Sequence, residues 1–570
     1  MKWQKTLDHV LISIILINFI AILLYIIVNP NAVEFNINNL MIILPTFLII
    51  DFISIVILFF LSLKQILDQL KAIQKHIWVI LILLMILQIS ISVFLVPTVH
   101  RILFDEDIYL QIANHVAKEG RAIFCDHGTQ ERCYEGFLNK EPNGYPVLMG
   151  VVFFFFGTSE NLAFNFSLLM GTLSIAIIFL ISYLLSKKES IGLWSSLILA
   201  LTPSYLMWSR SISVELTFVF LSLLTIFVFL LYFRIKTLRM LLLGILLLAF
   251  TVQIRPESVL LVPVIFLMFL LFDKNLKNKI FDYNFLALWT LFIVLIAPHM
   301  LHMYYENKAS DWGAPQGKFD IKYLDYNFKI NSSFWFNNKF HPLLFTIFSV
   351  VGTIYLLVYN RRIILFIGFW FMIFFGLYLV FYSGSFESGG IGTRFAMIVY
   401  PPVIILGGYG IYALYHILDK LIKAPIAKNA FTIFILTIML LSFYPFISFI
   451  STPEPQANSA RGEHDLADRV SREINNSCVV LTHNPGMLIV MGKEALQVRY
   501  AYDPKVMKDI FKRTDCVFFI EGYWCNTEPH KSSVCKFIHD NYNLTTYARD
   551  VITMPGNINW TLTAYRVGPR

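Results

Sequence analysis

Three consecutive carboxylates, Asp105, Glu106 and Asp107, follow shortly after the apolar run 77–97. Acidic side chains beside a membrane are costly to desolvate and are usually functional. On a helix, Asp105 and Asp107 point apart, whereas Asp105 and Tyr109 share a face. A carboxylate within reach of an acceptor hydroxyl can serve as a general base. We therefore predict that Asp105 is catalytic, supported by the next two acids. The alternative, which is compatible with it, is that Asp105 caps a helix that begins there.

A second polar segment, Lys140-Glu141-Pro142, precedes an apolar run of only 12 residues, 146–157. Twelve residues are too few to cross a bilayer as a helix. Proline and glycine at the start of this run allow a bent, re-entrant entry, which is tolerated only where it lines protein or a cavity. We expect Lys140 and Glu141 to lie near the three acids. The alternative is an interfacial turn whose charged side chains reach toward water.

Three arginines, Arg210, Arg255 and Arg394, lie at the ends of apolar runs where the charge bias disfavours them. An arginine at such a place is costly unless it pairs with an acid or a lipid phosphate. Glu215 and Glu257 are close in sequence and offer the ion-pair alternative. We predict that at least one of the three arginines binds a lipid phosphate.

His299 and His302 are spaced to share one face of a helix, which is compatible with a metal pair. The simpler interpretation is two polar residues at a helix end, and we expect no required metal or cofactor. No nucleotide-binding loop, zinc ribbon or Ser-His-Asp signature is found, which argues against an ATP-driven pump. We expect no nucleic-acid partner.

The elements that position these residues are apolar runs. The chain has 570 residues, of which 57% are hydrophobic and 14% charged, more apolar and less charged than a soluble protein. We therefore predict an integral, polytopic, all-α membrane protein with about 13 transmembrane helices, since each run except 146–157 is treated as a crossing. The apolar runs are 10–28, 40–62, 77–97, 146–157, 161–185, 191–207, 213–233, 240–253, 257–272, 285–303, 341–359, 362–382, 394–416 and 429–450.

Lysine and arginine in the short loops predict the orientation. Every second connection is basic, whereas the opposite short loops 29–39 and 383–393 carry neither residue. The N-terminus is therefore expected in the cytoplasm, with the three acids and the C-terminal tail outside the plasma membrane. The basic connections hold Lys2, Lys5, Lys64, Lys71, Lys75, Lys187, Lys188, Arg234, Lys236, Arg239, Lys274, Lys277, Lys279, Arg361, Arg362, Lys420, Lys423 and Lys428.

All six cysteines lie outside the apolar runs, on the side assigned as external. An even number of cysteines confined to polar segments predicts disulfides and an oxidising compartment, with the pairing left open. Free thiols in small polar domains are the alternative. The cysteines are Cys125, Cys133, Cys478, Cys516, Cys525 and Cys535.

The chain is expected to divide into two extra N-terminal helices (1–76), a membrane core (77–450) and a small extracytoplasmic α/β domain (451–570). The core includes the large outer loops 98–145 and 304–340. A polar helix at 463–474 and short apolar strands at 478–481, 517–520 and 560–567 predict the α/β character of the tail. The tail has no phosphate-loop motif, which argues against a nucleotide site.

With these parts in place, the chain resembles the GT-C superfamily of membrane glycosyltransferases, in the branch of the bacterial aminoarabinose transferases and protein O-mannosyltransferase-like proteins. The similarity spans roughly residues 77–450, and it rests on the order of several short blocks. The blocks are Asp105-Glu106 with Tyr109, Ile112-Ala113 and Gly120; Glu141-Pro142 with Gly144-Tyr145-Pro146, Phe156-Gly157 and Ser159-Glu160; Pro203 to Glu215; Arg255-Pro256-Glu257; and Arg394 with Pro401-Pro402 and Gly407-Gly408.

The resemblance implies an inverting transfer of a hexose or pentose from a polyprenyl-phosphate carrier to a hydroxyl of a lipid, glycan or protein acceptor, outside the membrane. By motif position, Asp105 is the general base. The external arginines and Lys140 suit the carrier phosphate, whose developing charge they would stabilise. Lipid-phosphate donors in the superfamily generally need no nucleotide-type metal site.

Three departures qualify the resemblance. Ile108 stands where the aminoarabinose transferases carry Arg, and Lys140-Glu141-Pro142 stands in place of their Glu-Lys-Pro, which puts an aminoarabinose substrate in doubt. The oligosaccharyltransferase signature Trp-Trp-Asp-Tyr-Gly is absent. A transporter or flippase of lipid-linked sugars is the alternative from another class, and inverted repeats with broken helices would favour it. A non-catalytic scaffold is a third hypothesis.

Overall fold

The computed structural model of the chain describes most of its length. The predicted apolar run 10–28 and the lysines at 2, 5, 274, 277, 279 and 423 lie outside the described residues. The described residues are 13, 33–102, 104–273, 282–309, 317–336, 340–387, 391–421, 425–452, 458–522, 524–525, 529–554 and 558–570.

The chain forms two compact units, and each is built from segments far apart in sequence. The first unit includes Ile50–Thr98 and Phe164–Thr452. The second consists of Asn31–Ile49, Val99–Ala163 and Pro453–Arg570. The first outer loop and the C-terminal tail therefore belong to one body.

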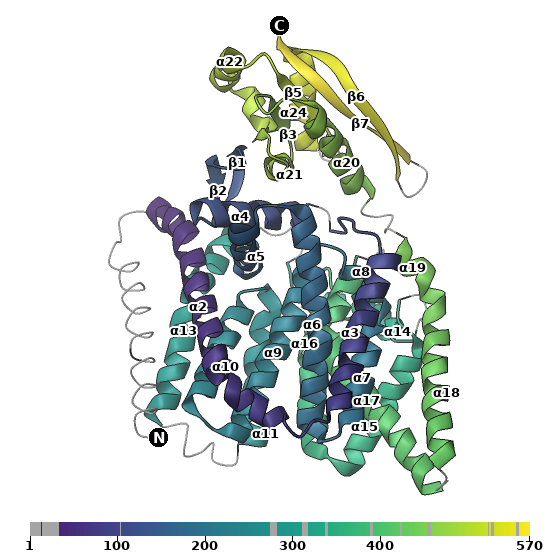
Figure 1. The fold of residues 1–570 in the computed structure, drawn as a ribbon. Helices are drawn as coiled ribbons and strands as arrows, with labels where there is room; N and C mark the ends of the chain where they lie inside the picture. The colour runs from purple at the N-terminus through teal and green to yellow at the C-terminus, as the bar shows by residue number, and fades with distance from the viewer. Residues whose placement is uncertain are drawn as a thin grey trace. The chain divides into compact units, whose positions relative to one another are not determined.

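The first unit is entirely helical apart from one isolated bridge, between Phe319 and Phe381, among its described residues. Eight described helices of the chain are long and apolar enough to cross a membrane, and five shorter apolar helices accompany them. The helices of this unit are α2 (Val33–Leu70, which begins in the second unit), α3 (Lys75–Leu95), α6 (Glu160–Ser186, whose first turn lies in the second unit), α7 (Glu189–Ala200), α8 (Pro203–Trp208), α9 (Val214–Ile235), α10 (Leu238–Val252), η1 (Pro256–Leu260), α11 (Leu261–Phe272), α13 (Tyr283–Ala309), η2 (Ile321–Tyr323), α14 (Leu324–Phe334), α15 (Leu343–Tyr359), α16 (Arg361–Val380), α17 (Thr393–Leu421), α18 (Pro425–Phe443), η4 (Tyr444–Phe446) and α19 (Ile447–Ser451) (Figure 1).

Among the described residues, the predicted apolar runs correspond to helices, and three of the runs are divided. The run 257–272 contains η1 and α11, and the run 429–450 contains α18, η4 and most of α19. The run 191–207 is split into α7 and α8, because Pro203 starts a new helix and Thr202 before it is extended, with φ −76° and ψ 114°. Proline disfavours the helical conformation in the residue before it. The predicted polytopic helical fold class, with a small α/β part, is confirmed.

Glycines allow α15 and α17 to approach closely. A Cβ added to Gly352 would lie 1.9 Å from the carbonyl oxygen of Leu406, and one added to Gly410 would lie 1.8 Å from that of Phe348. Small residues at such contacts let helix backbones pack directly, which is how helices associate in lipid. This pair brings α17, with Arg394 in its first turn, into the interior of the bundle.

The second unit contains a seven-stranded mixed sheet in the order β2-β1-β4-β3-β5-β7-β6. β3 is parallel to β4 and β5, and the remaining neighbours are antiparallel. The elements are α4 (Asp105–Glu119), β1 (Phe124–Gly128), β2 (Cys133–Phe137), α5 (Gly144–Phe156), α20 (Asn458–Glu473), β3 (Val479–Thr482), α21 (Pro485–Val490), β4 (Glu494–Gln497), η6 (Val498–Tyr502), α22 (Pro504–Arg513), β5 (Val517–Glu521), α24 (Pro529–Asn541), β6 (Tyr542–Met554) and β7 (Ile558–Pro569) (Figure 1).

The first-loop hairpin β1–β2 extends the sheet of the tail. His127 and Gly128 of β1 pair with Leu496 and Ala495 of β4. The predicted tail helix and the three predicted tail strands are present as α20, β3, β5 and β7. The pairing of β1 with β4, across more than half of the chain, was not predicted.

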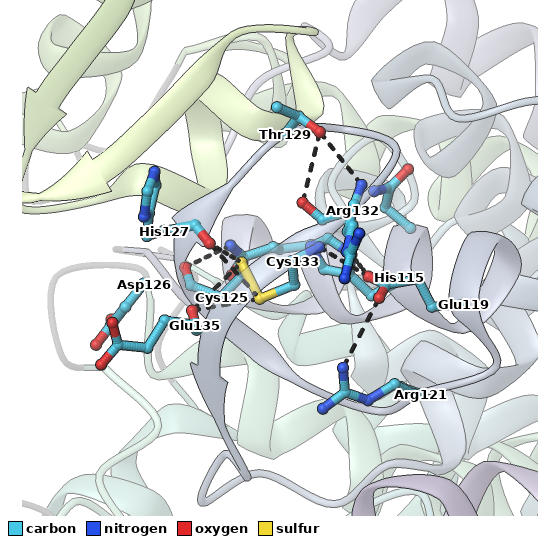
Figure 2. Close-up of a disulfide and its surroundings, with 12 residues drawn as sticks. His115, Glu119, Arg121, Cys125, Asp126, His127, Thr129, Arg132, Cys133 and Glu135 are labelled. Carbon is cyan, nitrogen blue, oxygen red and sulfur yellow. Dashed lines mark hydrogen bonds and ion pairs between the residues drawn. A yellow bond between two sulfur atoms is a disulfide. The ribbon is translucent and has the colours of Figure 1, made fainter. Parts of the chain in front are cut away.

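Three disulfides brace the second unit, and the predicted use of cysteine is confirmed. Cys125–Cys133 joins β1 to β2 across the hairpin (Figure 2). Cys478–Cys516 links the residues that precede β3 and β5, and Cys525–Cys535 ties a short segment to α24. No described cysteine is free.

Candidate active site

The three acids occupy the first turn of α4, where their charges suit the positive end of the helix dipole. Asp105 is the first helical residue and is half-buried; the N-cap is Phe104. Phe104 adopts a left-handed conformation, with φ 59° and ψ −21°, which is strained for a bulky residue. Its ring lies 4.8 Å from that of Trp524. The packing of Phe104 against Trp524 therefore fixes the backbone at the start of α4, where Asp105 lies.

Glu106 is fully buried and holds the segment that leads into α4. Its Oε1 accepts hydrogen bonds from the backbone N–H groups of Arg101 (2.8 Å) and Ile102 (3.1 Å). Its Oε2 lies 2.9 Å from Nδ1 of His100. Charged hydrogen bonds of this kind, made in a buried place, are strong and rigid. Glu106 therefore positions the helix start, on which Asp105 depends.

Asp107 is buried, with 7% of its surface exposed. Its Oδ2 accepts a hydrogen bond of 2.8 Å from Nδ2 of Asn484, and its buried Oδ1 has no hydrogen-bond partner among the described residues. Burial raises the pKa of Asp107, against the opposing charges of His100 and His464. Burial alone would lower the pKa of His100, but the charge of Glu106 and the hydrogen bond to it leave that pKa well above its usual range.

Helix α5 packs directly on α4 and brings two blocks of the predicted pattern together. The ring of Tyr109 meets that of Tyr145 edge to face, with centroids 5.4 Å apart and an interplanar angle of 85°. A Cβ on Gly150 would lie 2.7 Å from Cγ1 of Val116. Glycine at this position is therefore what allows the two helices to touch.

Lys140 and Glu141 lie half-buried in the turn before α5, in the same unit as the three acids. Lys140 forms no ion pair within the described part of the chain. A lysine without a carboxylate partner keeps its charge available for an anion. The re-entrant path of α5 stays a prediction; its last three residues, Phe154, Phe155 and Phe156, are exposed.

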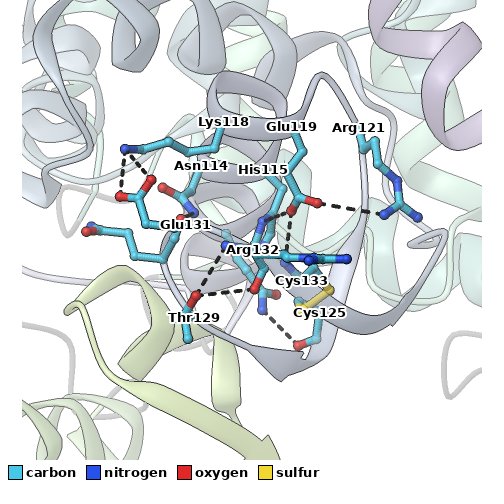
Figure 3. Close-up of polar contacts among 12 residues, drawn as sticks. Asn114, His115, Lys118, Glu119, Arg121, Cys125, Thr129, Glu131, Arg132 and Cys133 are labelled. Carbon is cyan, nitrogen blue, oxygen red and sulfur yellow. Dashed lines mark hydrogen bonds and ion pairs between the residues drawn. A yellow bond between two sulfur atoms is a disulfide. The ribbon is translucent and has the colours of Figure 1, made fainter. Parts of the chain in front are cut away.

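The disulfide hairpin holds α4 from one side. Gln111 donates from Nε2 to the carbonyl oxygen of Cys125 (2.8 Å). Oε1 of Glu119 lies 2.8 Å from Nδ1 of His115 and accepts a hydrogen bond of 2.9 Å from the backbone N–H of Cys133 (Figure 3). These contacts tie the last turns of α4 to both strands of the hairpin.

The tail holds the same hairpin. Asp126 pairs with Arg499, and Nε2 of His127 lies 3.1 Å from Oε1 of Glu494. Gln130, in the turn between β1 and β2, donates to the carbonyl oxygen of Val490 (3.0 Å). The position of α4, and with it Asp105, therefore depends on residues more than 350 positions further along the chain.

In the first unit, two of the predicted arginines converge on one buried acid. Glu215 is fully buried and pairs with Arg255, and Nε of Arg394 lies 3.9 Å from Oε1 of Glu215. Arg255 also donates from Nε to Glu257 (2.6 Å), which accepts a hydrogen bond of 2.8 Å from the hydroxyl of Tyr378. The ion-pair alternative therefore accounts for Arg255.

Arg210 has a different environment. It donates to Oδ1 of Asn165 (3.3 Å) and to the hydroxyl of Thr98, both neutral groups. No carboxylate pairs with it in the described residues. No carboxylate of the described residues therefore compensates its charge, which is the condition expected of an arginine that meets an external anion.

His299 and His302 lie together on α13, with ring centroids 6.3 Å apart. No third metal-ligating side chain joins them in the part of the chain that the structure describes. Among the described residues, three other groups bring metal-ligating side chains together, and two of these use cysteines that are in disulfides. The third group contains His100, Asp107 and His464.

The comparisons with known proteins agree with this architecture. Residues 140–302 match the family model of dolichyl-phosphate-mannose-protein mannosyltransferases. The structure is similar to ArnT from Cupriavidus metallidurans in the apo state, with a TM-score of 0.54 and 11% identity over 86% of this chain and 99% of that one. The chain has the GT-C fold. ArnT from Cupriavidus metallidurans bound to undecaprenyl phosphate gives a TM-score of 0.54 and 10% identity, over 87% of this chain and 100% of that one.

An oligosaccharyltransferase from Archaeoglobus fulgidus, in complex with zinc and sulfate, gives a TM-score of 0.49 and 11% identity. The match covers 85% of this chain and 72% of that one. A search of the curated proteins found no match.

The sequence placed the acids at the start of a helix or turn, and the structure shows all three in the first turn of α4. Their partners were not predicted. His100 and His464 carry no local pattern that marks them, and Glu160 entered only as part of a motif. The acids, Lys140, Glu141 and the cysteines belong to one unit, and the three arginines, His299 and His302 belong to the other.

Proposed function

We propose that this protein is an inverting glycosyltransferase that moves a sugar from a polyprenyl-phosphate carrier to an acceptor hydroxyl on the extracytoplasmic side of the membrane. The observation that carries the proposal is the position of Asp105. It is half-buried at the head of α4, whereas Glu106 and Asp107 are buried. Of the three acids, Asp105 is thus the one that an acceptor can reach.

The chemistry follows from these groups. Asp105 takes the proton from the acceptor hydroxyl as its oxygen attacks the anomeric carbon. The bond from that carbon to the carrier oxygen breaks, and the electron pair leaves with the phosphate. Attack opposite to the leaving group inverts the configuration. Asp105 lies in the first turn of α4, where the helix dipole favours an anion.

Positive charge is required where the phosphate leaves. Arg210 and Lys140 are the best candidates, since neither has a carboxylate partner among the described residues. Arg394 is a third, because its ion pair with Glu215 is long, at 3.9 Å. Arg255 is held by two glutamates and is better suited to positioning the others.

The side of the membrane is inferred from two features. The basic residues of the short loops place the N-terminus in the cytoplasm. The three disulfides lie in the unit that contains Asp105, and disulfides persist in oxidising compartments. The sugar and the acceptor, whether lipid, glycan or protein, are to be identified by experiment.

The test is a transfer assay with purified protein in detergent. A panel of radiolabelled polyprenyl-phosphate sugars is mixed with a membrane extract as the source of acceptors. We expect the wild type to move label to an acceptor. Asp105→Asn should lose transfer by at least about a hundredfold, in the range of general-base catalysis, while its apparent melting temperature stays unchanged. Arg210→Gln should weaken donor use without unfolding the protein.

A fully active Asp105→Asn protein would overturn the assignment of the base. Tight binding of one labelled donor, with no transfer by the wild type to any acceptor, would instead favour a flippase of lipid-linked sugars. Asp325→Asn serves as the control, because Asp325 is in the first turn of another helix, α14, and is exposed.

A further inference from the structure

We propose that His100, Asp107, Glu160 and His464 form a binding site for a divalent transition metal, with Zn²⁺ as the ion that it fits best. The site is separate from the transfer reaction proposed above and does not depend on it. The bound ion would join the tail, through His464, to the first outer loop and to the first turn of α6. All four residues belong to the second unit.

Three of the side chains form a compact group, and Glu160 lies beside both of its histidines. One ligand atom each from His100, Asp107 and His464 lies within 4.8 Å of the other two. Oε1 of Glu160 lies 3.0 Å from Nε2 of His464, and its Oε2 lies 3.8 Å from Nε2 of His100. The two imidazole rings are 4.4 Å apart, centroid to centroid. Two nitrogens and two carboxylates are a common ligand set for zinc, and donors at these separations reach a shared ion with small rotamer changes.

The surrounding groups are those that orient metal ligands. Nδ1 of His100 is held by the buried carboxylate of Glu106 at 2.9 Å, so Nε2 faces the cluster. A carboxylate behind a histidine ligand is the usual outer arrangement at zinc sites, because it fixes the ring and strengthens the ligand. Asn484 holds Oδ2 of Asp107 at 2.8 Å in the same manner and directs Oδ1 away from itself.

The unsatisfied oxygen of Asp107 is the second, independent sign of a ligand. Asp107 is 7% exposed, and its Oδ1 is buried without a hydrogen-bond partner in the described part of the chain. A buried carboxylate oxygen without a partner is costly and calls for a cation or a proton. The cluster has three carboxylates, from Glu106, Asp107 and Glu160, around two imidazoles, so a divalent ion would offset two of the three negative charges with both rings neutral.

The choice of zinc follows from the compartment as well as the ligands. The cysteines of the second unit are in disulfides and offer no thiolate. In an oxidising environment, a redox-inert ion held by imidazole and carboxylate is the stable choice. The two other clusters of potential ligands, at His115 and His483, each contain a disulfide-bonded cysteine pair and are not sites of this kind.

The test measures bound metal in the full-length protein in detergent. The protein is stripped with a chelator, loaded with Zn²⁺ and desalted, and its zinc content and melting temperature are determined. We expect one zinc per chain and a higher melting temperature with zinc. In His464→Gln, zinc affinity should fall by more than about tenfold. A loss of about tenfold is already expected when a residue that only hydrogen-bonds to a metal ligand is removed, and His464 would be a ligand itself. Asp107→Asn, which keeps an oxygen for Asn484, should behave likewise.

His539→Gln is the matched control. His539 also places Nε2 against a glutamate of the second unit, Oε2 of Glu521 at 3.3 Å, but it belongs to none of the ligand clusters. It should bind zinc as the wild type does. Equal zinc binding by His464→Gln, or no zinc in the wild type, would overturn the proposal. If His464→Gln lowered the melting temperature by the same amount with and without zinc, the four residues would instead form a network of imidazolium–carboxylate ion pairs, and the proposal would be overturned. Because the readout is metal content, failure of sugar transfer leaves this test unaffected.

Discussion

Glu106 is the buried support of the acidic turn, and Glu106→Ala tests this structural role most directly. Glu106 is fully buried, and removing its carboxylate leaves the backbone N–H groups of Arg101 and Ile102 without their acceptor. Each buried donor left unsatisfied costs about 1–3 kcal/mol. With the loss of the contact to His100, the expected destabilisation is about 3–5 kcal/mol.

The assay is a thermal scan of purified protein in detergent, with every variant scanned at one rate, because the melting of such a protein is often irreversible. For a domain of 150–250 residues, about 1 kcal/mol shifts the melting temperature by 2–4 °C. Glu106→Ala should therefore lower the apparent melting temperature by roughly 6–20 °C.

Glu131→Ala is the control for the loss of a glutamate from the same loop. Glu131 pairs with Lys118 at 2.8 Å, but its side chain is 70% exposed. An exposed ion pair contributes about 0–1 kcal/mol, so its removal should shift the melting temperature by a few degrees at most. Equal shifts for Glu106→Ala and Glu131→Ala would refute the view that Glu106 organises the start of α4.

Two further predictions concern the supports of α4. Gly150→Leu should destabilise the protein by about 1–3 kcal/mol, measured by the same thermal scan, because its side chain would overlap Val116 of α4. Burial by itself raises the pKa of Glu494, but hydrogen bonds from His127 and Arg513 and their charges leave it below the usual value. A carboxylate with a lowered pKa stabilises the fold above its unfolded pKa and loses that contribution as the pH falls. The gap in melting temperature between the wild type and Glu494→Gln should therefore be full above about pH 4.5 and close at lower pH.

Each of these predictions has a clear contrary outcome. Gly368→Leu is the control for the glycine, since nothing lies within 4 Å of a Cβ there; similar melting temperatures for the two leucine variants would contradict the close packing of α4 on α5. A gap between wild type and Glu494→Gln that stays constant from neutral pH to pH 3 would contradict the role of the ionised Glu494 in joining the hairpin to the tail.

Much of the helical architecture follows from local patterns in the sequence. Runs of about 20 apolar residues can be satisfied in lipid only as helices, so their positions are predictable one at a time. Short apolar segments between turn residues in the tail likewise predicted β3, β5 and β7. The division of the run 191–207 was missed because the effect of Pro203 was not weighed against the hydropathy of the whole run.

The candidate site was predictable only in part. The three acids follow an apolar run, so their place at a membrane edge could be inferred, and spacing predicted that Asp105 and Asp107 point apart. Which acid is buried could not be inferred, because burial depends on what packs against α4. Asn484, which holds Asp107, is separated from it by 377 residues and has no sequence signal that connects the two.

The sequence by itself therefore determined the class of protein, the membrane helices, the acidic turn and the α/β character of the tail, because each is a local property of composition and periodicity. Only the tertiary structure decided that the first-loop hairpin pairs with β4, that two arginines share Glu215, and that His464 reaches Glu160. These contacts join segments that are far apart along the chain. They are selected by the packing of the whole body, which no local pattern encodes.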